Sequence, residues 1–412
     1  MQREPFAAHW REIAAHFLKL GLTAYGGPAI MGIMQTEIQE RRRWVSKERF
    51  VEGLSLANVL PGATATQLGI FLGHARGGWW GGLLAGLCFV LPAFAIMLAL
   101  AITYAHLGAT PVMRGGLYGL GPVVLGIFVV AVYRLGRAAA ATRPQVAIAV
   151  AAAGAAAFSP LGMATILVLS AGVGLWLFHS ARVGSLTLAA LIAVIGATHI
   201  AHKLLSPLVA SPAQVAAPAP TSLVDIATFF FKVGALTFGG GLTMIALIQE
   251  QVVDQYHWLS HQEFVDGLAL GQFTPGPILM VAAYVGYKGA GVAGAMTAAA
   301  ASFLPSFILM LGVLPVFERV RALAWTNAVM KGVGPAVIGV LAVFLVKMAP
   351  HALPDRFAIA ILMATVIALL VWRIGAIKLM VSGAVLGVLR SRVPMVPGVR
   401  AALGQVRAHA GL

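Results

Sequence analysis

Residues 17–133 and 230–346 of this 412-residue chain are two copies of one sequence unit. The copies align at an offset of 213 residues, which becomes 214 across a middle stretch. The aligned positions include residue types that shared glycine and alanine richness does not explain: Lys19 with Lys232, Gly26 with Gly239, Gly27 with Gly240, Glu37 with Glu250, Trp44 with Trp258, Pro61 with Pro275 and Gly62 with Gly276. The two halves are therefore homologous, and any account of the fold has to accommodate one unit twice.

Long apolar stretches recur along nearly the whole sequence and decide the solvent in which it folds. Hydrophobic residues make up 60% of the chain and charged residues 10%, whereas roughly a quarter of the residues of a soluble domain are charged. Helices satisfy their own backbone hydrogen bonds in lipid. We therefore expect an all-α polytopic membrane protein with roughly 10–13 membrane segments.

The formal net charge of +15 is typical of cytoplasmic loops held against anionic lipid, so the lipid bilayer is the expected partner and nucleic acid is not. Cys88 is the single cysteine of the chain and lies in an apolar run, which excludes an internal disulfide and a cysteine metal cluster. Residues 1–11 lack a small-residue cleavage site, so we expect the N-terminus to be retained.

The duplication also predicts the domain organisation. The sequence divides into an N-terminal half (1–205, with a repeat core at 17–140 and further apolar segments at about 145–158, 161–179 and 183–200), a Pro- and Ala-rich linker (206–222), a C-terminal half (223–392, with a repeat core at 230–347) and a basic tail (393–412). We expect each half to supply one side of a shared structure.

Positive charge is distributed differently in the two halves. The stretch 41–49 is rich in Arg and Lys, whereas its counterpart, 253–263, contains neither. Further along, Arg319 and Arg321 stand opposite an uncharged turn around His106. Because loops rich in Lys and Arg remain in the cytoplasm, equivalent loops lie on opposite sides, which predicts inverted-topology repeats. The side of the C-terminus stays open, because Arg373 and the basic tail cannot both be cytoplasmic if 374–389 crosses the membrane.

Helix-breaking residues interrupt each apolar unit twice. The interruptions are Tyr25-Gly26-Gly27-Pro28 and Leu60-Pro61-Gly62 in the first half, and Phe238-Gly239-Gly240-Gly241 and Thr274-Pro275-Gly276-Pro277 in the second. Non-helical backbone survives at membrane depth only where it is buried in protein or lines a polar cavity. We therefore predict broken or re-entrant helices whose breaks meet near the midplane, whereas Pro92 and Pro305 alone are ordinary kinks.

Meeting breaks would form a site suited to an anion. The N-terminus of a half-helix presents unpaired N–H groups and roughly half a positive charge. Neutral polar side chains flank the breaks and could replace the hydration of an oxyanion without trapping it; they are Asn58, Thr64, Thr66 and Gln67 around Pro61, and Gln272 and Thr274 beside Pro275. The candidate substrate site also includes Gly26, Gly27, Gly62, Gly239, Gly240 and Gly276.

Six charged residues near the breaks are candidates for fixed charge or ion coupling: Lys19, Lys232, Glu37, Glu250, Arg76 and Lys288. The lysines at 19 and 232 could equally extend to the interface. The two glutamates could carry a proton, but both lie near predicted segment ends, where solvated capping competes with that role. Arg76 and Lys288 follow the second break and would sit at its mouth.

Histidines suggest one alternative, a metal site. His257 and His261 have i,i+4 spacing with Glu263 nearby, but an exposed loop explains them better, and the same discount applies to His199 and His202. We expect neither a metal nor another cofactor.

Together the motifs resemble the chromate ion transporter family, whose long members contain two repeated halves. The resemblance covers nearly the whole chain and rests on Phe17-Leu18-Lys19-Leu20-Gly21, the Gly26-Gly27-Pro28 break, the Glu40-Arg41-Arg42-Arg43-Trp44 run, Leu60-Pro61-Gly62, Phe238-Gly239-Gly240 and Pro275-Gly276-Pro277. The sequence departs from the usual pattern at Tyr25, Ala63 and Gly241, which puts substrate selectivity rather than the fold in question.

The resemblance implies export of chromate across the inner (plasma) membrane, driven by the proton motive force, with sulfate as the isosteric competitor and with resistance to chromate as the result. Transport or exchange of sulfate or another oxyanion is the alternative, and a homodimer is open. A membrane-embedded enzyme is the rival from another class, but it would need paired carboxylates or a His and acid cluster inside apolar segments, and the sequence shows no such constellation.

Overall fold

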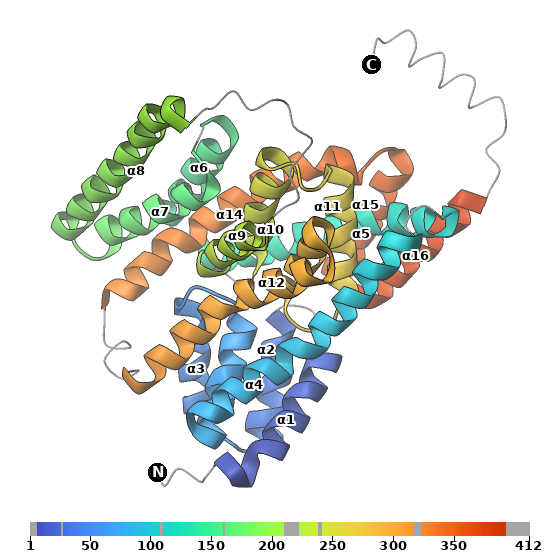
Figure 1. The fold of residues 1–412 in the computed structure, drawn as a ribbon, viewed down its shortest axis with the longest axis horizontal. Helices are drawn as coiled ribbons and strands as arrows, with labels where there is room; N and C mark the ends of the chain where they lie inside the picture. The colour runs from blue at the N-terminus through green and yellow to red at the C-terminus, as the bar shows by residue number, and fades with distance from the viewer. Residues whose placement is uncertain are drawn as a thin grey trace.

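The computed structural model describes residues 6–25, 28–107, 110–159, 161–209, 222–237, 241–316 and 324–392. All regular secondary structure in these residues is helical (Figure 1). The first half contains α1 (Phe6–Thr23), α2 (Pro28–Met34), the π-helix η1 (Gln35–Arg41), α3 (Lys47–Val59), α4 (Thr64–Leu107), α5 (Pro111–Ala139), α6 (Arg143–Phe158), α7 (Met163–Phe178) and α8 (Ala181–Val209). The second half contains α9 (Leu223–Ala235), α10 (Leu242–Ile248), the π-helix η2 (Gln249–Gln255), α11 (His261–Phe273), the short η3 (Ile278–Met280), α12 (Val281–Val313), the short η4 (Leu314–Val316), α14 (Ala324–Ala352), α15 (Arg356–Leu370) and α16 (Ala376–Arg392).

Four of the described helices are long and apolar enough to cross a membrane, and they are Thr64–Leu107, Pro111–Arg137, Ile278–Val313 and Trp325–Ala352. Shorter apolar helices accompany them, among them α6, α7 and α15. The prediction of an all-α polytopic membrane protein is confirmed.

The long helices α4 and α12 are each a tight helical hairpin. In α4 the helical conformation is lost at Gly77 and Gly78, where Gly78 has φ 65°, and in α12 it is lost at Ala290 and Gly291, where Gly291 has φ 60°. A Cβ at Gly73 would collide with the carbonyl of Gly81. The two residues lie this close because the chain folds back on itself at the turn. Each hairpin therefore has a first arm, 64–76 or 281–289, and a long arm, 79–107 or 292–313.

Helical correspondence between the halves extends beyond the residues aligned by sequence. Helices α6 and α7 recur 213 residues later as α15 and α16, so each repeat includes two more helices than its sequence core. Helix α8 has no counterpart among the described residues. It follows the first repeat and leads toward the second (Figure 1).

These additional helices are exchanged between the halves. Helices α6 and α7 pack on α14 of the second repeat, whereas α15 and α16 pack on α5 of the first, as Figure 1 shows. The exchanged pairs touch backbone to backbone, because a Cβ at Gly119 would collide with the carbonyl of Gly383, and one at Gly332 with that of Ser170. The two halves are therefore interlocked rather than joined only by a linker.

The inner helices of each repeat pack alike. Helix α1 lies on the long arm of α4, α9 lies on α12, and α4 and α12 contact each other between them. The approach is close at equivalent glycines, since a Cβ at Gly21 would lie 2.6 Å from the carbonyl oxygen of Phe89, and one at Gly234 would collide with that of Ser302. The α4–α12 contact places the ends of the broken helices at the junction of the halves.

Candidate substrate site at the junction of the two halves

Two reciprocal hydrogen bonds connect the Pro-Gly breaks to the opposite halves across the junction. The N–H of Gly62 donates to the carbonyl oxygen of Thr237 (2.7 Å), and the N–H of Gly276 donates to the carbonyl oxygen of Ala24 (2.8 Å). Gly62 and Gly276 are equivalent in the repeat, as are Ala24 and Thr237. Each Pro-Gly break is therefore tied to the residue that leads into the glycine break of the opposite half.

The glycine breaks themselves, Gly26 and Gly27 with Gly239 and Gly240, lie outside the described residues. The chain is described up to Tyr25 and Thr237 and resumes at Pro28 and Gly241. Gly241, which departs from the proline of the first half, has φ 93° and precedes the first turn of α10.

Glycine is required at both Pro-Gly breaks for conformation and for space. Gly62 has φ 130° and Gly276 has φ 93°, which are values that residues with a Cβ rarely adopt. A Cβ at Gly62 would collide with Ser306 Oγ, and one at Gly276 would lie 3.0 Å from the Cβ of Ala93. Ala93 and Ser306 are equivalent residues on the long arms of the hairpins. Each break is thus pressed against the long arm of the other half.

Polar groups from both halves surround the Pro61-Gly62 break. The N–H of Ala63 donates to Ser306 Oγ (2.8 Å), and Gln67 Nε2 donates to the carbonyl oxygen of Pro61 (2.8 Å). Thr66 Oγ1 and Gln67 Oε1 are buried, and neither has a hydrogen-bond partner among the described residues. A buried polar atom without a partner costs about 1–3 kcal/mol, so this site needs a ligand or water.

Thr64 begins α4 and is buried beside these groups. The first N–H groups of an α-helix lack intrahelical partners and carry partial positive charge. The first arm of α4 therefore presents backbone N–H donors beside the Thr66 hydroxyl, which has no hydrogen-bond partner among the described residues.

The second half is less polar at the equivalent place. Thr274 Oγ1 donates to the carbonyl oxygen of Leu270 (3.1 Å) and contacts Met97 Sδ (3.4 Å). The residues equivalent to Thr66 and Gln67 are Leu279 and Met280. The junction is consequently asymmetric, with more hydrogen-bonding side chains around the Pro61-Gly62 break than around the Pro275-Gly276 break.

The remaining predicted polar side chains stand farther out. Asn58, near the end of α3, is exposed, and its equivalent Gln272, near the end of α11, is half-buried. Pro61 is half-buried and Pro275 is buried. Gln249 at the start of η2 was not among the predicted site residues, yet its Oε1 is buried without a partner in the described part of the chain.

Most of the charged candidates are engaged in ion pairs or exposed. Lys19 and Lys232 are exposed on α1 and α9. Arg76 pairs with Glu12 (3.2 Å) and Lys288 pairs with Glu263 (2.6 Å). Neither pair includes a residue of the Pro-Gly breaks.

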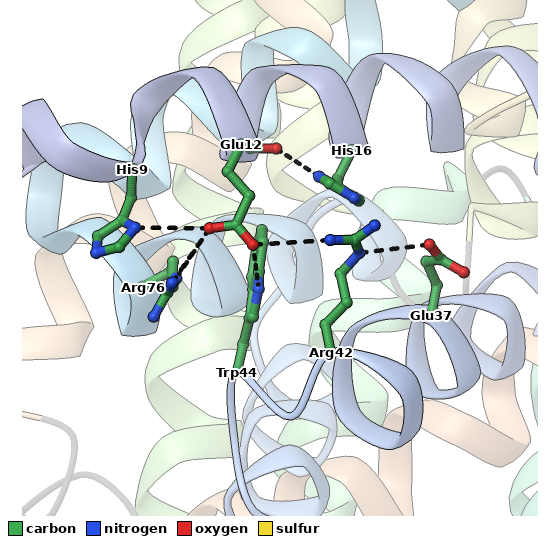
Figure 2. A network of polar contacts seen from close by, with 7 residues as sticks. All are labelled: His9, Glu12, His16, Glu37, Arg42, Trp44 and Arg76. Carbon is green, nitrogen blue, oxygen red and sulfur yellow. Dashed lines mark hydrogen bonds and ion pairs between the residues drawn. The ribbon is translucent and has the colours of Figure 1, made fainter.

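Glu12 is the centre of a polar network that connects α1, the segment after η1 and the first arm of α4 (Figure 2). Trp44 Nε1 donates to Glu12 Oε1 (3.0 Å), and Arg76 donates to Glu12 Oε2 (3.2 Å). Arg42 lies 3.7 Å from Glu12 and donates to Glu37 (3.4 Å), so Glu37 belongs to the same network. The sequence offered no local signal for this role of Glu12, because its partners are far away in the chain.

The equivalent place in the second half is aromatic. Trp258, the counterpart of Trp44, lies 5.7 Å from Phe229 and stacks on Tyr256 at 5.2 Å, measured between ring centroids. The two repeats thus present a charged cluster and an aromatic cluster at corresponding positions.

Glu250 joins the two halves. Its Oε2 accepts a hydrogen bond from the N–H of Met163 (2.9 Å), the first residue of α7. The carboxylate is half-buried and caps a helix of the first half. Capping was one of the two roles that the sequence left open for this residue.

The histidine motif lies at the start of α11. His261 pairs with Asp254 (3.4 Å) and stacks on His351 (4.1 Å), and His257 Nδ1 lies 2.8 Å from the carbonyl oxygen of Val253. The part of the chain that the structure describes holds no group of three His, Cys, Asp or Glu side chains arranged for a metal ion. The side chains of His199 and His202 lie outside the described residues.

Comparison with known proteins places this chain among transporters. The family model for chromate transporters matches residues 11–177 and 224–388, so it spans both repeats including α6, α7, α15 and most of α16. The chain is 31% identical over 381 residues to a chromate transport protein of Cupriavidus metallidurans, covering 91% of this chain and 92% of that protein. It is 32% identical over 351 residues to a probable chromate transport protein of Synechococcus elongatus (84% of this chain and 86% of that protein), and 32% identical over 345 residues to a chromate transport protein of Pseudomonas aeruginosa (82% and 80%). No solved structure matches the chain. With both repeats matched, and with the relatives aligned over most of their length, the chain belongs to the chromate transporter family.

Proposed function

We propose that the protein exports chromate from the cytoplasm across the inner membrane, and that the oxyanion binds at the junction where the two Pro-Gly breaks contact the opposite halves. The observation that carries this proposal is the pair of reciprocal hydrogen bonds, Gly62 to Thr237 and Gly276 to Ala24, beside a buried hydroxyl, that of Thr66, without a partner. The relatives named for chromate transport support the substrate, and sulfate or exchange of oxyanions is the alternative at the same site.

The binding groups suit an anion that has to be released again. Thr66 and the first turn of α4 offer neutral donors, and the described residues of the two Pro-Gly breaks carry no cationic side chain. Hydrogen bonds from neutral groups replace hydration, and they are weaker than the charge-assisted bonds that a buried cation would make to a dianion. The substrate, rather than a permanent counter-ion, would then satisfy the Thr66 hydroxyl.

Inverted topology would let one site open to either side of the membrane. Reciprocal contacts between equivalent residues indicate an approximate two-fold relation between the repeats. The Arg-rich stretch 41–49 and its counterpart without Arg or Lys, 253–263, favour an axis in the membrane plane. Rocking of one repeat against the other around the junction would expose the site to each side in turn.

The membrane potential favours export. Moving one charge through 100 mV is worth about 2.3 kcal/mol, so a dianion that leaves a negative interior gains about 4.6 kcal/mol. Export would lower cytoplasmic chromate and thereby confer resistance.

Chromate uptake into everted membrane vesicles tests this function. With the vesicle interior made positive, we expect potential-dependent uptake that excess sulfate inhibits. The double variant Gly62→Ala with Gly276→Ala should abolish it, because both positions need a positive φ. Gly154→Ala is the matched control, since a Cβ at Gly154 on α6 has no described atom within 4 Å. Absence of chromate uptake in vesicles that hold the potential and contain the protein would refute the substrate assignment.

A further inference from the structure

Asp266 on α11 is the only charged side chain among the described residues that is buried, with 6% of its surface exposed. Ionisable groups inside a membrane protein are costly to bury and therefore mark ion and proton pathways. The aspartate was not among the residues that the sequence singled out.

The hydrogen-bond partners of Asp266 are neutral. Tyr104 on the long arm of α4 donates its hydroxyl to Oδ2 (2.8 Å), and Gln262 Nε2 donates to Oδ1 (3.1 Å). The structure gives Asp266 no ion pair within the described residues, although a buried carboxylate normally has a cationic partner. Two neutral donors stabilise the charge only in part, which leaves protonation as the other way to neutralise it.

A cavity of about 270 Å³ borders Asp266. It lies between α5, α11 and the end of α14, and its polar lining consists of Arg114, Tyr118, Gln262, Asp266 and His351. His351 is stacked on His261, which pairs with Asp254 of η2. Imidazole side chains act as proton shuttles in proteins.

The other carboxylates around α11 are already paired. Glu263, on the same helix, pairs with Lys288 of α12. Asp355 accepts a hydrogen bond from Tyr118 and pairs with Arg390 of α16 (2.6 Å). Arg114 of α5 faces the cavity, and Tyr284 of α12 donates to the carbonyl oxygen of Glu263 (3.0 Å) rather than to Asp266. Asp266 is thus the carboxylate of this region that a proton can reach without first breaking an ion pair.

The first half holds a paired carboxylate at the equivalent position. Glu52 aligns with Asp266 at the 214-residue offset, and Arg49 lies 2.9 Å from it. Arg49 aligns with Glu263, so the second half has an acid where the first half has the cation of this pair. One repeat thus keeps a neutralised carboxylate where the other keeps a carboxylate facing a cavity.

Asp266 is mechanically linked to the junction. Helix α11 runs from Asp266 to the break at Thr274, roughly 12 Å away at 1.5 Å per residue. The long arm of α4 accompanies it, since Tyr104 contacts Asp266 and Met97 contacts Thr274. A change in the charge of Asp266 therefore acts on two elements that also border the candidate substrate site.

We propose that Asp266 is a proton-binding site of the transport cycle, loaded through the cavity beside His351. One carboxylate oxygen takes a proton from cavity water to form a neutral acid, and the proton returns to water when the site opens to the other side. This inference rests on the proposed transport function. It assigns coupling to Asp266 rather than to Glu37, which belongs to the Glu12 network, or to Glu250, which caps α7.

Purified protein in liposomes tests the site when the membrane potential is clamped at zero with potassium and valinomycin. We expect a pH gradient to drive chromate accumulation by the wild type, up to tenfold per pH unit for each coupled proton. Asp266→Asn should lose this accumulation while still exchanging labelled for unlabelled chromate at equal pH. The control variant Glu52→Gln should keep both activities.

Tyr104→Phe is a second variant that keeps the ring packed on Tyr284, 5.7 Å away, and removes only the donated hydroxyl. We expect the pH at half-maximal flux to move upward, because the ionised carboxylate loses a donor. An effect of structure alone would lower flux without moving that pH.

The possible failures are distinguishable. A pH response of Asp266→Asn equal to that of the wild type would overturn the proton site, as would a wild type that responds to a sodium gradient and not to a pH gradient. If the wild type did not exchange labelled for unlabelled chromate, the proposed substrate would be refuted instead.

Discussion

Replacing Thr66 by valine should stabilise the empty protein and weaken substrate binding at the same time. The side chain is fully buried, and its hydroxyl has no partner among the described residues. Valine has the same shape without the hydroxyl, so the substitution removes a cost of about 1–3 kcal/mol from the empty site. A residue with a purely structural hydrogen bond would change stability in the opposite direction.

The loss in binding follows from the same hydroxyl. A hydrogen bond to a charged group contributes about 1.5–3 kcal/mol. Its loss should raise the dissociation constant of the oxyanion roughly 10- to 150-fold. We therefore expect Thr66→Val to raise the Tm of the detergent-solubilised protein without substrate and to reduce the additional Tm shift that chromate or sulfate produces.

Thr365→Val is the matched control for this experiment. Thr365 is also buried, but its hydroxyl donates to the carbonyl oxygen of Ile361 (2.8 Å) within α15. We expect this variant to show no gain in Tm and to keep the substrate-induced shift. The reasoning would be refuted if Thr66→Val lowered the Tm of the empty protein and left the response to chromate unchanged.

Two further predictions concern the interlocked halves. Gly119→Ala should destabilise the protein by about 1–3 kcal/mol and so lower its Tm, because the added Cβ would collide with the carbonyl of Gly383 on α16. Thermal unfolding of this variant and of Gly154→Ala checks this, and equal Tm values would contradict the exchanged packing. Burial raises the pKa of Asp355, but hydrogen bonds from Tyr118 and from the N–H of Ala358, together with the charge of Arg390, outweigh burial and hold its pKa below the ordinary value. Its contribution to stability is therefore present above the ordinary carboxyl pKa of about 4 and is lost as the pH falls through the lowered folded-state pKa. Asp355→Asn should flatten the acid limb of a Tm against pH curve, and an unchanged acid limb would refute this assignment.

Local sequence patterns were informative about the breaks because broken helices have a local cause. Pro61-Gly62 and Pro275-Gly276 cannot continue a helix, and their recurrence at one offset indicated a shared structural purpose. The structure brings these two breaks to one junction, and whether substrate binds there stays a prediction. Membrane class was equally accessible, because apolar length alone decides it.

Partners distant in sequence were not accessible from local patterns. Arg76 was expected at the mouth of a break, but it pairs with Glu12, 64 residues earlier. The exchange of α6 and α7 with α15 and α16 also has no local signature, because either pair could pack on α5 or on α14. Asp266 closely follows the His257 to Glu263 cluster, and no local sequence pattern separates it from that cluster. Its hydrogen-bond partner Tyr104 lies 162 residues earlier in the chain.

The most direct test of the account is to locate the bound oxyanion itself. Crystals grown with chromate or selenate would show it by anomalous scattering of chromium or selenium. We expect a peak within hydrogen-bonding distance of Thr66 Oγ1 and the first turn of α4, at the junction that the Gly62 and Gly276 hydrogen bonds define. A fully occupied peak elsewhere, such as in the cavity beside Arg114 and His351, with the junction empty, would contradict the central claim.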